Sequence, residues 1–128
     1  MLKLFKNITE EITDLEKTEM VPILVDTLMR SSHTNILKGK HLCGLLQASR
    51  YTVSEARIRK MINYIRVLNL MSPNVLIGTS QGYFITDDPH VIDDQIESLQ
   101  GRIDSTEAVI DSIKAQRLNL THLKVAIQ

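Results

Sequence analysis

The segment Ser54–Thr86 constrains the fold most, because a basic helical pattern runs directly into a short hairpin pattern. Its first half repeats apolar side chains at helical spacing, at Ile58, Met61, Ile62, Ile65 and Leu68. This spacing predicts a helix with one buried face. The other face carries Arg59, Lys60 and Asn63, and Ala56 leaves room for a close approach. Such a helix, followed by a β-ribbon, suits the major groove of DNA, so the sequence predicts a DNA-binding protein.

Two helices are expected before this segment. The first covers Asn7–Glu19, where Asn7 and Glu10 fit a capping box and most of the exposed residues are acidic. Pro22 predicts that a second helix begins there, because proline is favoured in the first turn of a helix and unfavourable in its interior. The polar stretch 31–35 is expected to end this second helix.

A third helix is expected at Gly39–Ala48, with its leucines and Cys43 facing inward, and a polar turn follows it. Thr52 then fits the N-cap of the basic helix, because Glu55 stands three residues further on. Ser54 is the alternative cap. The basic helix is expected to end near Leu68.

The hairpin is predicted from two apolar runs, Val75–Ile77 and Tyr83–Thr86, which flank the loop Gly78–Gly82. Asp88 and Pro89 then fit the N-cap and the first position of a last helix. The expected fold class is therefore mainly α with a small β-hairpin and a long C-terminal helix.

The last helix carries a seam of residues spaced alternately by four and three. Its members are Ile92, Ile96, Leu99, Ile103, Thr106, Ile110, Ile113, Arg117 and Leu120. A narrow stripe of this kind is typical of coiled coils, whereas the buried face of a globular helix is wider. Pairing with a second chain is therefore favoured, which makes residues 88–128 a dimerisation helix. Folding back on the first helix of the same chain is the alternative.

Positive charge is concentrated in the middle of a chain whose formal net charge is zero. Residues 36–70 hold seven Lys/Arg against one acidic residue, whereas 1–35 hold four against six. Residues 71–86 hold no charged side chain, and 87–128 hold four basic against eight acidic residues. A local basic patch is enough to provide phosphate contacts. A solvated basic face with no partner is the simpler alternative.

Three segments together resemble a known family: Gly39–Leu46, then Ser54-x-x-x-Ile58-Arg59-x-x-Ile62-x-x-Ile65-Arg66, then Gly82-Tyr83. They are similar to the winged helix-turn-helix DNA-binding domain of the biotin-repressor type, over roughly residues 22–86. The resemblance implies a winged domain at 21–87, preceded by a separate helix within 1–20. Nothing that follows resembles a ligase, so biotin chemistry is not implied.

The resemblance also implies which residues contact DNA: Ser54, Arg57, Arg59, Lys60 and Asn63 on the groove-facing helix, Arg66 near its end, and Thr79, Ser80 and Gln81 at the wing tip. Arg59 and Asn63 are the expected base readers, because these side chains can hold guanine and adenine through two hydrogen bonds. Lys40, Lys60, Arg57 and Arg66 are expected at phosphates. This chain departs from the family in two ways. The wing tip lacks Lys and Arg, and the turn before the groove-facing helix holds about five extra residues, Ala48–Thr52.

Other chemistry is not indicated. The four histidines are scattered, the single Cys43 lies between leucines as a core residue would, and no nucleophile–base arrangement appears. We therefore expect no enzyme activity, no metal and no cofactor. No membrane span or secretory leader is expected, which makes the cytoplasm the default location.

The expected function is sequence-specific binding of double-stranded DNA by a small homodimeric transcription regulator, of a design that fits phages or mobile elements. A protein partner on the acidic first helix is a further expectation. The alternative is a protein–protein interaction module built on a winged helix, or an accessory factor in DNA replication.

Overall fold

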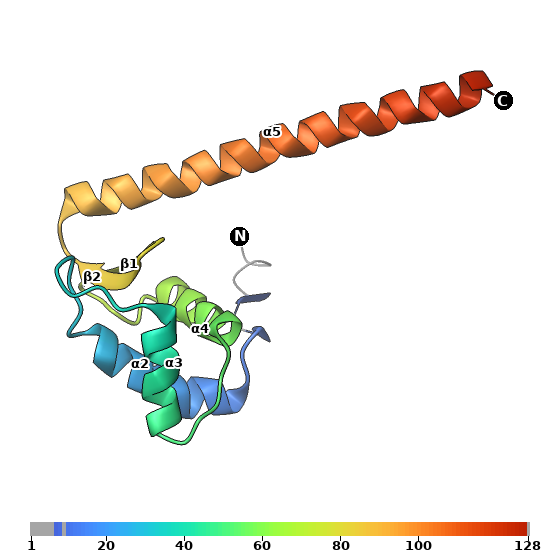
Figure 1. The fold of residues 1–128 in the computed structure, drawn as a ribbon. Coiled ribbons are helices and arrows are strands. Elements are labelled where there is room, and N and C mark those ends of the chain that lie inside the picture. Colours follow the sequence, from blue (N-terminus) through green and yellow to red (C-terminus); the bar gives the residue numbers. More distant parts are fainter. Residues whose placement is uncertain (1–6, 9, 128) are drawn as a thin grey trace. The chain divides into compact units, whose positions relative to one another are not determined.

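The computed structural model describes residues 7, 8 and 10–127 and is mainly helical, with one small antiparallel sheet (Figure 1). The expected fold class is confirmed. Two compact units, Met1–Ile92 and Asp93–Gln128, are each described by themselves. The elements are η1 (Glu16–Met20), α2 (Val21–Leu28), α3 (Gly39–Ala48), α4 (Glu55–Val67), β1 (Val75–Thr79), β2 (Gly82–Thr86) and α5 (Pro89–Ile127).

The predicted first helix, Asn7–Glu19, is wrong in its extent. The helical backbone is interrupted at residues 11–13 and resumes at Asp14. Thr13 and Glu16 form the capping box there: the Thr13 N–H donates to the Glu16 carboxylate (2.8 Å), and the Glu16 N–H donates to the Thr13 hydroxyl (3.1 Å). Residues 1–6 and Thr9 of the predicted N-terminal segment lie outside the described residues.

Pro22 does not start a separate helix either, because η1 leads directly into α2. The π-helical turn ends with the Val21 N–H bonded to the Glu16 carbonyl, one residue further back than in an α-helix. This wider turn accommodates a proline, which has no N–H and disrupts a regular α-helix interior. Ile12 and Met20 are buried in the same core as α2, so the N-terminal segment belongs to the first unit.

The core of the first unit is formed by the buried faces of α2, α3 and α4, joined by side chains from η1 and β1. Its fully buried side chains are Leu24, Leu28, Leu42, Leu46, Ile58, Met61, Ile62 and Ile65. The periodic stripe predicted for the basic helix is thus confirmed at Ile58, Met61, Ile62 and Ile65, whereas Leu68 is half-buried at the C-cap. Because these branched side chains fix one side of α4, the residues between them face outward.

The turn between α3 and α4 is closed by backbone hydrogen bonds. Arg50 adopts a positive φ of 71°, while the Tyr51 N–H bonds the Leu46 carbonyl (2.8 Å) and the Arg50 N–H bonds that of Gln47 (2.9 Å). These are the two bonds of a Schellman motif, which ends a helix sharply. Ser54 then caps α4 by accepting from the Arg57 N–H, so the alternative cap is correct and Thr52 is not the cap.

The hairpin is longer and its turn is tighter than predicted. Thr79 pairs with Gly82, which leaves Ser80 and Gln81 as the only residues between the strands. Gly82 has a φ of +136°, and a Cβ there would lie 2.4 Å from the carbonyl oxygen of Leu37. Leu37 in turn exchanges two backbone hydrogen bonds of 2.8 Å with Tyr83. The chain before α3 therefore pairs with the edge of the hairpin at β2. Glycine is required at position 82 because the Leu37 backbone passes too close for a side chain.

The last helix begins where it was predicted to begin. Asp88 accepts a hydrogen bond from the His90 N–H (3.0 Å), and Pro89 is the first helical residue. From there α5 continues as one helix of 39 residues to Ile127.

Candidate nucleic-acid interface

The α4 helix presents a polar face opposite its buried isoleucines. Arg59 and Asn63, the two expected base readers, are exposed, as is Ala56 between them and the cap. Lys60 is half-buried. The DNA prediction requires that Arg59, Lys60 and Asn63 are not covered by the protein's own chain. Within the first unit Arg59 and Asn63 meet this condition fully, and Lys60 meets it in part.

A pocket of about 380 Å³ lies where the N-terminus of α3, the first turns of α4 and the β1–β2 turn come together. Its lining residues are Lys38, Gly39, Lys40, Glu55, Arg59, Thr79, Ser80, Gln81, Gly82 and Tyr83. The fold thus gathers Lys40, Arg59 and the predicted turn residues around one depression. Three cations, three hydroxyl-bearing side chains, one amide and one carboxylate line it, and the excess of cations suits an anionic, hydrogen-bonding partner.

Lys38, Glu55 and Tyr83 line this pocket but were not predicted as site residues. A Cβ on Gly39 would lie 3.3 Å from a Glu55 carboxylate oxygen, so this acid stands beside the first residue of α3. A carboxylate is favourable there, because the N–H groups of a helix N-terminus carry positive partial charge. Lys38 stood in the basic segment, but only the folded chain shows that it faces the same pocket as Arg59.

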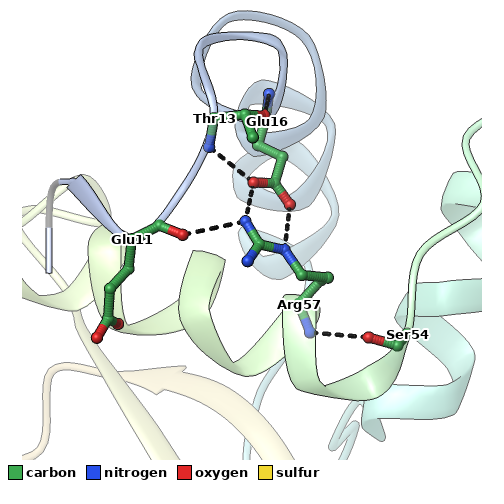
Figure 2. Close-up of polar contacts among 5 residues, drawn as sticks. All are labelled: Glu11, Thr13, Glu16, Ser54 and Arg57. Carbon is green, nitrogen blue, oxygen red and sulfur yellow. Dashed lines mark hydrogen bonds and ion pairs between the residues drawn. The ribbon is translucent and has the colours of Figure 1, made fainter.

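Arg57 faces the N-terminal segment and is held by it (Figure 2). Its Nε donates to Glu16 Oε2 (2.9 Å), and one Nη atom donates to Glu16 Oε1 and to the Glu11 carbonyl (3.1 Å). The Glu16 side chain is 5 % exposed, and the guanidinium lowers the pKa of this carboxyl below its ordinary value. The charge of Arg57 is therefore compensated within the chain.

Two other predicted contact residues are also engaged. The Ser54 hydroxyl accepts the Arg57 N–H as the cap of α4. Arg66 is half-buried beside the hairpin, where a Cβ on Gly78 would lie 3.4 Å from its Nη1 atom. The cations that line the pocket are instead Lys38, Lys40 and Arg59.

Glu16 and Glu19 of the acidic first segment both form contacts within the chain. Glu16 binds Arg57, and Glu19 accepts a hydrogen bond from the Tyr51 hydroxyl (2.9 Å), which raises the pKa of this tyrosine. Glu10, Glu11 and Asp14 are exposed. The segment is thus tied both to α4 and to the turn that precedes it.

Comparisons with protein-family models, with curated proteins and with solved structures gave no match. Within the described residues, no three His, Cys, Asp or Glu side chains are grouped so that they could hold a metal ion. None of the helices in that part of the chain has both the length and the apolar character needed to cross a membrane.

Proposed function

We propose that this protein binds specific sites on double-stranded DNA as a small cytoplasmic transcription regulator. The exposed face of α4 would enter the major groove. The observation that carries the proposal is the position of Arg59. It stands on the exposed face of a helix and lines a cationic pocket with the N-terminus of α3 and the β1–β2 turn.

A winged helix-turn-helix of the biotin-repressor type accounts for the element order of the first unit. Helices α2, α3 and α4 precede the hairpin, and α3 and α4 are joined by a closed turn (Figure 1). The antiparallel bridge between Leu37 and Tyr83 adds one backbone pair beside β2. In this proposal α4 is the recognition helix and the β1–β2 hairpin is the wing.

The side chains divide into base readers and phosphate contacts. Arg59 can donate two hydrogen bonds to guanine, and Asn63 can pair with adenine in the same way. Lys40 and Lys38 lie at the α3 end of the pocket and suit phosphates, which fix position without reading sequence. Glu55 can accept a hydrogen bond from cytosine, and its negative charge weakens indiscriminate phosphate binding.

The uncharged wing tip favours a second function. Ser80 and Gln81 carry no charge, so the turn lacks a cation for phosphate contact. A winged helix that serves as a protein–protein interaction module, or as a DNA replication accessory factor, needs no basic wing tip. In the first of these cases the pocket would receive an acidic segment of another protein.

Selection from a pool of randomised DNA duplexes tests the proposal. The wild-type protein should enrich a short motif that contains guanine and adenine, the partners of Arg59 and Asn63. The Arg59→Ala/Asn63→Ala variant should enrich no motif, although circular dichroism should show it folded because both side chains are exposed. Failure of the wild-type protein to retain any duplex, or the same motif from both proteins, would refute DNA reading by α4.

A further inference from the structure

The α5 helix exposes a long apolar seam. Beyond Ile92, which is half-buried and belongs to the first unit, the seam residues lie in the open. Ile96 is 60 % exposed, Ile103 is 52 % exposed and Ile113 is 58 % exposed. The exposed seam from Ile96 to Leu120 is about 36 Å long at 1.5 Å per residue. A largely apolar stripe of that length marks an interaction surface.

We propose that α5 pairs with α5 of a second copy of this chain in a parallel, two-stranded coiled coil. The seam repeats every seven residues from Ile96 to Leu120 without a slip, which is the pattern that a coiled coil requires. This pairing does not depend on DNA binding and goes beyond it.

The types of residue in the seam favour two parallel strands. When the seam is numbered as a heptad abcdefg, the a positions of its first three repeats hold the β-branched residues Ile96, Ile103 and Ile110. Of the four d positions from Leu99 to Leu120, leucine occupies the two ends, and Thr106 and Ile113 occupy the other two. Isoleucine at a with leucine at d packs best in parallel dimers.

The polar residue in the middle of the seam does not oppose burial. The Thr106 hydroxyl donates to the Arg102 carbonyl of its own helix at 2.7 Å. Its hydrogen-bond donor is therefore satisfied, and the methyl group can face the second copy. Arg117 near the far end is a less favourable layer, but its long side chain can turn its charged head to water.

Charges beside the seam complement each other in the parallel register. Arg102 lies at a g position and Glu107 lies at the e position five residues later, where g of one strand meets e of the other. Two such pairs, related by the dimer axis, would form. The next two g–e combinations, Val109 with Lys114 and Gln116 with Thr121, bring no like charges together. Antiparallel pairing would place g against g and lose the Arg102–Glu107 contact.

The parallel orientation has a consequence that does rest on the proposed function. Both copies of the first unit would leave the coiled coil at the same end, because α5 follows that unit directly. Two recognition helices at one end can bind two related half-sites on one DNA duplex.

Single cysteines in the seam test the pairing and its orientation in the full chain. Leu99→Cys and Leu120→Cys are placed separately in a Cys43→Ala background, because Cys43 is the only native cysteine. On oxidation, each variant alone should form a covalent dimer, because like positions face each other in a parallel pair. Cross-linking only in a mixture with an Ile96→Cys or Ile110→Cys partner would show an antiparallel pair and overturn the proposed orientation.

Sedimentation equilibrium tests pairing itself. The wild-type protein should sediment with twice the mass of the chain, and Ile103→Asp should sediment as a monomer because it places two carboxylates in the seam. Ala108→Asp is the matched control, since Ala108 lies on the exposed side away from the seam and should leave the dimer unchanged. A monomeric wild-type protein, or an unchanged mass for Ile103→Asp, would overturn the proposal. Neither cross-linking nor sedimentation involves DNA, so failure of the pairing proposal is distinct from failure of the proposed function.

Discussion

Arg57 of α4 donates hydrogen bonds to both carboxylate oxygens of Glu16, which stands 41 residues earlier in the chain (Figure 2). The same carboxylate accepts the Thr13 N–H, so one acid both caps a helix and binds a guanidinium. This contact connects the N-terminal segment to the start of the proposed recognition helix. Arg57, which is expected from the sequence at a DNA phosphate, therefore has a partner within the protein.

Arg57→Met should lower the free energy of unfolding by about 2 kcal/mol, because it leaves the buried Glu16 carboxylate without its charged partner. Urea unfolding followed by circular dichroism measures this loss. Arg30→Met is the matched control: the Arg30–Asp26 pair is largely exposed, with 78 % and 75 % of the two side chains accessible, so its loss should cost less than about 0.5 kcal/mol. Equal losses for both variants would show that the Glu16 pair contributes no more than a surface contact.

The Glu16 pair should also make stability depend on pH. Its carboxyl has a pKa below the ordinary value of 4.5 when folded, so the unfolded chain takes up a proton first as the pH falls. The stabilisation is therefore complete above that value and is lost as the pH drops through the folded pKa. The difference in unfolding free energy between the wild type and Glu16→Gln should be constant over the neutral range, roughly pH 6–8. It should shrink in acid. A difference that does not change with pH would contradict the ionic role of Glu16.

Local patterns predicted much of the first unit. The α3 bounds, the buried stripe of α4 and the Asp88 cap follow from spacing and capping within a few residues. The helix break at residues 11–13 was missed, although the Thr13–Glu16 pair has capping-box spacing. Pro22 led to the prediction of a helix boundary at that residue, whereas the π-helical turn before it lets the helix continue through the proline.

The partners of the site residues could not be predicted, because they come from distant parts of the chain. The Glu16–Arg57 contact spans 41 residues, and local spacing carries no signal for it. The pocket likewise depends on how Lys38 and Glu55 meet the turn at Ser80. Composition predicted that this region is basic, but only packing shows which cations share one surface.

Gly82 should tolerate no side chain. Gly82→Ala places a Cβ 2.4 Å from the Leu37 carbonyl oxygen at a φ of +136°, so we expect a loss of roughly 2–3 kcal/mol in stability. Gly44→Ala is the opposite case, because nothing lies within 4 Å of its Cβ in the exposed middle of α3. It should stabilise the protein by about 1 kcal/mol. Thermal unfolding of both variants checks the contrast, and a neutral Gly82→Ala would show that the crossing of Leu37 and β2 is not as tight as described.

The affinity for the selected DNA duplex, measured as a function of salt concentration, tests the central claim most directly. For the wild-type protein the logarithm of the binding constant should fall linearly with the logarithm of the salt concentration, by about 0.9 per phosphate contact. Lys40→Ala should reduce that slope by about 1 and keep the sequence preference, whereas Arg59→Ala should cost about 1–3 kcal/mol, roughly 5- to 150-fold in affinity, and relax the preference at one base pair. Arg30→Ala, which removes a cation that does not line the pocket, should bind as the wild type does. A salt-independent affinity, or an Arg59→Ala variant that binds like Arg30→Ala, would contradict DNA recognition by α4.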